Sequence, residues 1–355
     1  MDVVYNNEIY GTNLLHQAAL HGRSDYVAKI LELGADVNMT TKSEKYNVLH
    51  LAAMSKSDSE MKTNVFCSYI RSVSIQGQEV EDREYVPDTL KQFVNRQTWN
   101  DCVAIHVACR TNNAGVIRLL FDAGGDVNAR DYLGETPLHV AVKSSSVECL
   151  NILLEANAMV DVVNADKQTP LICSNQTHTD IVKALVEAGS DINHADRNGR
   201  TGMHIAAKCG DVDTVRYLCK KGVDINATDI HGQTSLMLVA LYEEVDILKL
   251  LCEMGARLDI RDNAGETVLH KTVWTEVDAA EKLLYLLEGQ NVPIDALDNR
   301  GRTALFPAVE FGDVELLCQK GFDLQTRDIH GTSLLHASCK PGLGDVNNRR
   351  MVTAC

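Results

Sequence analysis

The chain has 355 residues, of which 45% are hydrophobic, so it carries enough apolar material to fold. Its 34 basic and 49 acidic side chains leave a formal net charge of −15. A surface of that sign repels phosphate backbones and anionic lipid, and we therefore expect it to bind neither nucleic acid nor a membrane surface.

The N-terminal residues 1–10 are polar and acidic, whereas a secretory signal begins with basic residues followed by an apolar run. No later stretch reaches the roughly 18 apolar residues of a membrane helix. We expect an intracellular, cytoplasmic protein with no direct membrane insertion. The eleven cysteines include no Cys-x-x-Cys pair, which favours reduced, buried thiols over a disulfide framework or a zinc ribbon.

One sequence block recurs along the chain: Gly134–Val142 reads GETPLHVAV, and similar blocks begin at Gly199, Gly232 and Gly265. The residues at its histidine position are His16, His50, His106, His139, Ile172, His204, Met237, His270, Phe306 and His336. Most neighbours in this series are 32 to 34 residues apart. A fixed period of this length predicts a repeat architecture.

A second block follows the histidine position by about 18 residues, as in Gly124–Asn128 (GGDVN) and Gly222–Asn226 (GVDIN). Between the two blocks, runs such as Val212–Gly222 place apolar residues at helical spacing and end at a glycine that can terminate a helix. An Asp-x-x-Gly turn then leads to the next repeat. Each unit is predicted to be a helix, a turn, a second helix and a hairpin, and must stack on its neighbours to bury its apolar surface.

The two blocks closely resemble the repeats of the ankyrin family, and the resemblance covers nearly the whole chain. It implies an all-α ankyrin-repeat solenoid of about nine full repeats plus a truncated C-terminal one, with helix-turn-helix units joined by β-hairpin-like loops. We interpret residues 1–355 as a single ankyrin-repeat domain. The polar Asn13, where later repeats have threonine, indicates a capping unit. Residues 337–355 are interpreted as a degenerate cap or truncated repeat.

The interval of 56 residues between His50 and His106 contains about 23 additional residues, within the atypical stretch 55–99. We expect two helical pieces there, Asn64–Val73 and Thr89–Trp99, on either side of an exposed acidic loop at Gln76–Asp88. Long loops are often functional. A partner-specific recognition element and a tolerated, partly disordered surface loop both stay open.

Seven of the twelve histidines occupy the repeat position, and the resemblance implies that they form structural hydrogen bonds between units. Cys102, His106 and Cys109 are ligand types at plausible spacing, but no further ligand is evident and Cys109 occupies a small-residue position, so we expect a packed thiol and no metal. Three further cysteines are predicted to lie in core positions: Cys219, Cys252 and Cys318. No phosphate-binding or catalytic motif is present, and we expect neither a cofactor nor enzymatic activity.

The asparagines that end the second block match the position at which an asparaginyl hydroxylase modifies many ankyrin proteins. By this resemblance the candidates for hydroxylation are Asn38, Asn128, Asn193 and Asn226. The alternative is that these asparagines simply suit the hairpin turn.

In ankyrin arrays the first helices and hairpin tips line the concave surface, and by resemblance the variable positions there carry specificity. Just after the first helices, apolar and aromatic residues gather in the C-terminal third: Leu241, Tyr242, Trp274 and Phe311. The hairpin tips of the same region add Ile230, His231, Ile329 and His330. Clustered aromatics often anchor protein interfaces, so we predict partner binding here, with inward packing against the second helix as the alternative.

The hairpins also carry arginines among the turn aspartates: Arg130, Arg197, Arg200, Arg261, Arg300, Arg302 and Arg327. These arginines either form a locally basic edge that accepts an acidic peptide, or they pair with the neighbouring aspartates.

These features predict a protein-binding scaffold or adaptor that recruits one or more partner proteins on the concave ankyrin surface. The alternative is a regulatory ankyrin segment of a larger channel, enzyme or ubiquitin-ligase receptor. The sequence predicts neither the identity of the partner nor the oligomeric state.

Overall fold

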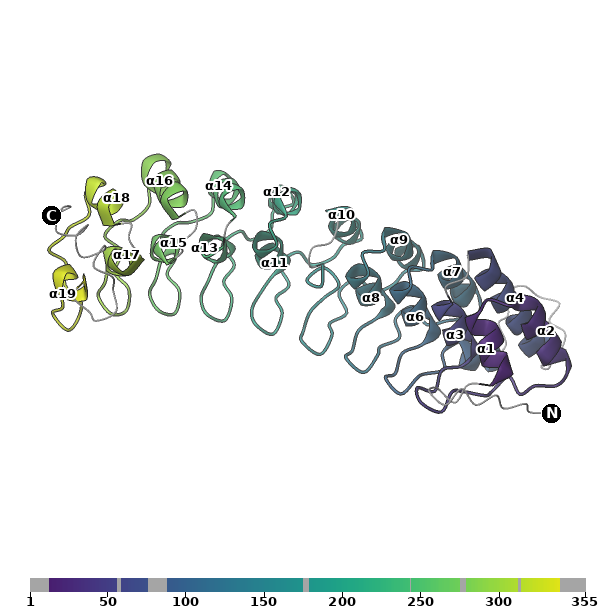
Figure 1. The fold of residues 1–355 in the computed structure, drawn as a ribbon. Helices are drawn as coiled ribbons and strands as arrows, with labels where there is room; N and C mark the ends of the chain where they lie inside the picture. Colours follow the sequence, from purple (N-terminus) through teal and green to yellow (C-terminus); the bar gives the residue numbers. More distant parts are fainter. Residues whose placement is uncertain are drawn as a thin grey trace. The chain divides into compact units, whose positions relative to one another are not determined.

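The computed structural model describes residues 13–55, 59–75, 88–174, 179–242, 244–274, 279–311 and 314–338. These residues belong to two compact units, Met1–Asp191 and Ile192–Cys355. Within each unit, a short inner helix is followed by an outer helix, and the next hairpin projects on the side of the inner helices (Figure 1).

The described part of the first unit contains four inner helices and five outer helices. The inner helices are α1 (Leu14–Leu20), α3 (Val48–Met54), α6 (Ala104–Arg110) and α8 (Pro137–Lys143). The outer helices are α2 (Ser24–Glu32), α4 (Ser59–Ile75), α7 (Ala114–Asp122), α9 (Val147–Glu155) and α10 (Thr179–Glu187). A further helix, α5 (Asp88–Val94), lies between α4 and α6 in the chain.

The second unit repeats the same arrangement. Its inner helices are α11 (Gly202–Lys208), α13 (Ser235–Ala240), α15 (Val268–Val273), α17 (Leu305–Phe311) and α19 (Leu334–Ser338). Its outer helices are α12 (Val212–Lys220), α14 (Val245–Glu253), α16 (Ala279–Gly289) and α18 (Val314–Gln319). The all-α solenoid predicted from the repeat is therefore confirmed.

The repeat histidines join each inner helix to the next hairpin, as the resemblance implied. In His139, Nδ1 accepts the Thr136 backbone N–H (3.1 Å), so the proton lies on Nε2, which donates to the Gln168 carbonyl at 3.0 Å. The same Nε2 bond to a later carbonyl recurs at His16, His50, His106, His204 and His270. Burial lowers the pKa of all six imidazoles, that of His50 to about 4.

The hairpins are held in register by their own turn residues and by one another. In the turn at Asp229, Oδ1 accepts the backbone N–H groups of His231 (2.8 Å) and Gln233 (2.9 Å). The Ile230 N–H then donates to the Asn198 carbonyl of the preceding tip at 3.0 Å. Gly199 adopts φ +72°, and a Cβ there would lie 2.9 Å from the Ile230 nitrogen, so this close approach of two tips requires glycine.

One inner helix predicted from the repeat is not formed by the described residues 168–174. The segment around Ile172 forms turns rather than a helix, within residues 168–174. Ile172 has no ring nitrogen to accept the Thr169 N–H, and the Ser174 hydroxyl donates to the Leu171 carbonyl at 2.6 Å, which competes with helical bonding. Residues 175–178, which would complete this repeat, lie outside the described part of the chain.

The helical pieces expected in the insertion are present as α4 and α5, with different limits. The 17-residue α4 packs against α2, α3 and α7, so it takes the place of an outer helix. Phe66 and Tyr69 are fully buried, and the Tyr69 hydroxyl donates to the Val37 carbonyl at 2.6 Å. The acidic loop expected at Gln76–Asp88 lies, except for Asp88, outside the described residues, as does most of the stretch 337–355.

Candidate functional site

The predicted aromatic column lies where inner helices of the second unit end. Trp274 is the C-terminal capping residue of α15, and Tyr242 follows Leu241, the capping residue of α13. Tyr242 is 41% exposed and Trp274 is 37% exposed, while Leu241 is half-buried. Exposure of this size argues against complete inward packing of the two aromatic rings. The side chain of Phe311, the third member of the column, lies outside the described part.

Two lysines contact Tyr242, one at its ring and one at its backbone carbonyl. The Lys208 Nζ, at the end of α11, lies 5.8 Å from the centroid of the Tyr242 ring, within the range of a cation–π contact. On the other side, the fully buried Lys282 of α16 donates a short hydrogen bond to the Tyr242 carbonyl. A buried ammonium group held by a carbonyl at a helix C-terminus also complements the helix dipole. The loop that carries Tyr242 is thus tied to the neighbouring outer helix.

The hairpin-tip residues predicted for partner binding are all exposed. Ile230 is 55% and Ile329 is 65% exposed, and His231 and His330 are exposed as well. The backbone of these tips is used in the tip-to-tip bonds, whereas their side chains face solvent. The tips therefore offer apolar and imidazole groups on a rigid backbone.

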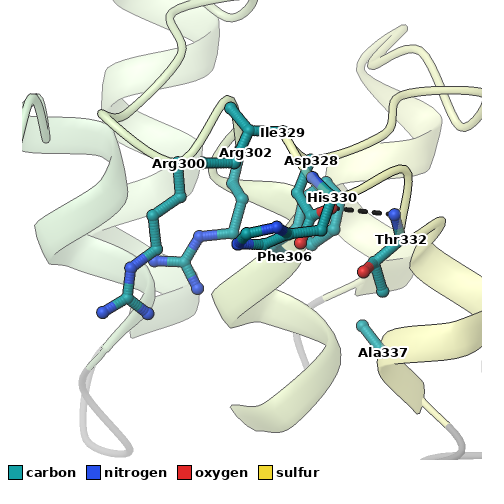
Figure 2. A pocket seen from close by; sticks show the side chains of 8 residues that line it. All are labelled: Arg300, Arg302, Phe306, Asp328, Ile329, His330, Thr332 and Ala337. Atoms are coloured by element: carbon teal, nitrogen blue, oxygen red, sulfur yellow. Dashed lines mark hydrogen bonds between the residues drawn. The ribbon is translucent and has the colours of Figure 1, made fainter.

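A pocket of about 490 Å³ lies between the last two described hairpins of the second unit. It is lined by Arg300, Arg302, Phe306, Asp328, Ile329, His330, Thr332 and Ala337. Figure 2 shows the two arginines reaching to one side of the pocket, with Thr332 and Ala337 on the other. Phe306 and Ala337 are each only 4% exposed and form an apolar floor, whereas Arg300, Ile329 and His330 are exposed at the rim.

The described hairpin arginines differ in their contacts, and only some of them pair with turn aspartates. Arg302 pairs with Asp298 of its own turn, with Nη2 and Oδ2 2.7 Å apart, and Arg200 lies 4.0 Å from Asp229. Three others bond to backbone carbonyls instead: Arg130 to Val163, Arg261 to Gly265 and Leu297, and Arg327 to Gly331. The exposed guanidinium group of Arg300 makes no ion pair with any residue in the described ranges.

The candidate asparagines link successive hairpins. Oδ1 of Asn128, Asn193 and Asn226 accepts a backbone N–H 31 residues further on, at 2.8 Å in each case. Asn38 differs: its carbonyl accepts Arg96 Nη1 at 2.9 Å, and no such side-chain bond to a later hairpin is formed with the described residues. Three of the four side chains thus join successive hairpins, and the hydroxylation of Asn38, Asn128, Asn193 and Asn226 stays a prediction.

Of the nine cysteines that the structure describes, five are buried and four are half-buried. Cys109 is fully buried, and burial raises the pKa of its thiol well above the usual value. Burial also raises the pKa of Cys252 to about 12. Cys219 and Cys318 are half-buried, so their prediction as core residues was only partly correct. Among the side chains that the structure describes, no three His, Cys, Asp or Glu residues gather in a metal-binding arrangement.

A second exposed aromatic cluster, which the sequence analysis did not single out, lies on hairpin tips of the first unit. Trp99 is 59% and Tyr132 is 61% exposed, and Lys45 Nζ lies 3.9 Å from the centroid of a Trp99 ring. Tyr132 follows its turn aspartate just as Ile230 and Ile329 follow theirs. Reading that tip position along the whole chain, rather than in the C-terminal third alone, would have found Tyr132.

No helix in the described ranges is both long enough and apolar enough to cross a bilayer.

Repeated helix pairs joined by bridging histidines, with exposed aromatic side chains at a few inner-helix ends and hairpin tips, are typical of all-α repeat proteins of the interaction-module class. Family models agree: ankyrin repeats in three copies match residues 81–164 and 156–229, and single ankyrin repeats match residues 10–39 and 231–263. The chain belongs to the ankyrin-repeat family, whose repeats generally mediate protein–protein interaction and are not catalytic.

Among curated relatives, the chain is 31% identical to the nuclear factor NF-kappa-B p105 subunit of Gallus gallus over 198 residues, which is 54% of this chain and 18% of the relative. It is 30% identical to neurogenic locus notch homolog protein 2 of Homo sapiens over 148 residues, 40% of this chain and 6% of the relative. The chain thus matches less than a fifth of the length of these relatives.

Proposed function

We propose that the chain is a protein-binding scaffold or adaptor, and that it holds its partner on the side of the second unit formed by the inner helices and hairpin tips. The observation that carries the proposal is the exposure of Tyr242 and Trp274 at equivalent ends of consecutive inner helices. Large aromatic side chains on a rigid support provide much contact area at a small entropic cost. Exposure of these aromatic side chains does not stabilise the folded repeat array.

The surrounding groups support the same role. Lys208 beside the Tyr242 ring adds a positive charge at the edge of the aromatic surface, and the buried Lys282 holds the Tyr242 backbone in place. Ile230 and Ile329 extend the apolar surface onto the hairpin tips. A partner would thus meet aromatic anchors with a polar rim, an arrangement typical of protein interfaces.

The test is capture of partners from cell extract by the tagged full-length chain, with identification by mass spectrometry, followed by affinity measurement with each purified partner. We expect Tyr242→Ala and Trp274→Ala each to weaken binding by roughly 10-fold or more, the usual loss at an interface anchor. Leu284→Ala is the matched control, because Leu284 is 37% exposed like Trp274 but lies on the outer helix α16. Equal affinities for all three variants, with circular dichroism unchanged, would contradict the proposal.

The alternative, a regulatory ankyrin segment of a larger protein, is favoured by one observation. The relatives reported above share only 18% and 6% of their own length with this chain, so in them a repeat region is part of a much longer protein. The size of the native protein in its source cells, measured by immunoblotting with an antibody against residues 192–338, tests this. A native species of about 39 kDa would support a self-contained adaptor, and a much larger one would support the regulatory segment.

A further inference from the structure

The pocket between the last two described hairpins coincides with a break in the histidine pattern. Phe306 of α17 is one of three residues, with Ile172 and Met237, that replace the histidine at this repeat position. In the preceding repeat, His270 Nε2 bonds to the Arg302 carbonyl at 3.0 Å and its Nδ1 lies 3.0 Å from Thr267 Oγ1. Phe306 can form neither bond, and the equivalent Thr303 Oγ1 is buried without a partner among the described residues.

The side chains lining this pocket separate into an apolar floor and a cationic rim. Phe306 and Ala337 give the floor its apolar character and are almost fully buried. Arg300 stands at the rim, and its backbone, not its side chain, serves the fold: its N–H donates to Asp298 Oδ1 and its carbonyl accepts the Ile329 N–H. The guanidinium group is thus held on a fixed backbone and is available to a ligand.

The other charged side chains that line the pocket, Arg302 and Asp328, form hydrogen bonds within their own hairpins. Both Arg302 nitrogens that face Asp298 are bonded to its carboxylate, at 2.7 and 2.9 Å. Asp328 Oδ1 accepts the backbone N–H groups of His330 (2.9 Å) and Thr332 (2.8 Å), so this carboxylate stabilises its own turn. Of the charged groups that line the pocket, Arg300 is the one without an ion-pair or turn partner in the described residues.

We propose that this pocket receives an acidic side chain and an adjoining apolar side chain of a partner segment, with the carboxylate on Arg300 and the apolar group between Phe306 and Ile329. A guanidinium group binds a carboxylate through two parallel hydrogen bonds, which favours Asp or Glu over a neutral amide. A volume of about 490 Å³ lies within the range of sites that bind small groups, and it can enclose one or two side chains. The inference rests on the proposed function and names the chemistry of one part of the partner.

The test uses the full-length chain and fluorescent nine-residue peptides of Gly and Ser, with Glu, Gln or phosphoserine at the centre and Leu or Ala next to it. Fluorescence anisotropy gives the affinities. We expect the Glu–Leu peptide to bind about 3- to 10-fold more tightly than its Gln–Leu counterpart, the range for a solvent-accessible bidentate pair. We also expect Leu to be preferred over Ala, because it covers the apolar floor.

Two variants and two controls locate the effect. Arg300→Gln is expected to remove the preference for Glu over Gln, and Ile329→Ala to reduce the preference for Leu over Ala. Arg257→Gln is the control for charge, because Arg257 is exposed but paired with Asp259, and Leu297→Ala is the control for an exposed apolar residue. Neither control variant should change either preference.

Several results would overturn the inference: no measurable binding of any peptide, equal binding of the Glu and Gln peptides, an unchanged preference in Arg300→Gln, or selective binding of the phosphoserine peptide. These outcomes differ from a failure of the proposed function. If a captured partner depends on Tyr242 and Trp274 but not on Arg300, the scaffold role stands and the acidic-side-chain site is wrong.

Discussion

Each bridging histidine has two structural roles: its side chain caps its own helix and forms a hydrogen bond to the following hairpin. Both roles require a neutral ring with Nδ1 as acceptor and Nε2 as donor, and burial enforces this by disfavouring the charged form. Of the three replacements, Met237 leaves its helix α13 intact, with its backbone N–H bonded to Thr234 Oγ1 (3.3 Å), whereas the other two change the structure locally. Ile172 lies in a turn instead of a helix, and at Phe306 the neighbouring Thr303 hydroxyl loses its partner.

Acid should destabilise the fold before the carboxylates titrate. Folded-state pKa values of the six bridging histidines lie below 6.5, that of His50 at about 4, while the unfolded chain titrates near 6.5. Below pH 6.5 the unfolded state therefore binds more protons, and the stability present above that pH is lost as pH falls towards 4. We expect His50 to account for about 1 kcal/mol between pH 7.5 and 5.5.

Urea unfolding at the two pH values measures this loss, and the other five histidines should add to it. A free energy of unfolding that stays constant between pH 7.5 and 5.5 would show that the bridging histidines are not held in the neutral form.

Thr267 and Thr303, which each lie three residues before the histidine position of their repeat, can be compared directly. Thr267 Oγ1 lies 3.0 Å from His270 Nδ1, whereas Thr303 Oγ1 is buried without a partner among the described residues. Thr267→Val should cost about 1 kcal/mol, since it removes a buried hydrogen bond, and Thr303→Val should be neutral or stabilising. Chemical denaturation of both variants provides the comparison, and equal destabilisation by the two substitutions would refute the assignment.

At the element scale, helices and hairpins were largely predictable because their signals are local. The threonine or asparagine at the start of an inner helix, the glycine at the end of an outer helix and the Asp-x-x-Gly turn are all read directly from the sequence. Whether a repeat with a substituted histidine still forms its helix depends on non-local bonds, and this is why the turn at Ile172 was not foreseen. The packing of α4 in place of an outer helix is a tertiary outcome as well.

The insertion is anchored through α4, and Tyr69 carries much of that attachment. Its ring is fully buried and its hydroxyl donates to the Val37 carbonyl at 2.6 Å. Tyr69→Phe keeps the packing but leaves this carbonyl without its donor, so we expect a loss of about 1–2 kcal/mol. Hydrogen exchange should show faster opening of residues 59–75, with little change in α12 and α14. An unaltered exchange rate in α4 would show that the hydroxyl bond does not hold the helix.

For the candidate site, the sequence predicted where the exposed aromatic residues lie, but not which charged side chains line the pocket. The periodicity placed Tyr242 and Trp274 at the C-terminal ends of consecutive inner helices, and both side chains are exposed there. The pocket at Arg300 was not predictable, because it depends on which arginines the turn aspartates neutralise. Arg302 and Arg300 are alike in sequence and two residues apart in one hairpin. Of their two guanidinium groups, only that of Arg302 pairs with the Asp298 carboxylate, which Arg300 contacts through its backbone N–H.

At the scale of the whole molecule, a period of about 33 residues set the fold and the family, and the family sets the general role of protein interaction. The chain as a whole is acidic, with a net charge of −15, so the cationic rim at Arg300 differs in sign from the overall charge. We propose that a partner lies against the inner helices and hairpin tips of the second unit.

The most direct test is hydrogen–deuterium exchange of the full-length chain with and without a partner obtained by affinity capture. We expect slower exchange in residues 229–242, 262–274 and 328–332 on partner binding, and unchanged exchange in the outer helices α12 and α14. Protection confined to those outer helices, with none at the inner-helix ends or the hairpin tips, would contradict this proposal.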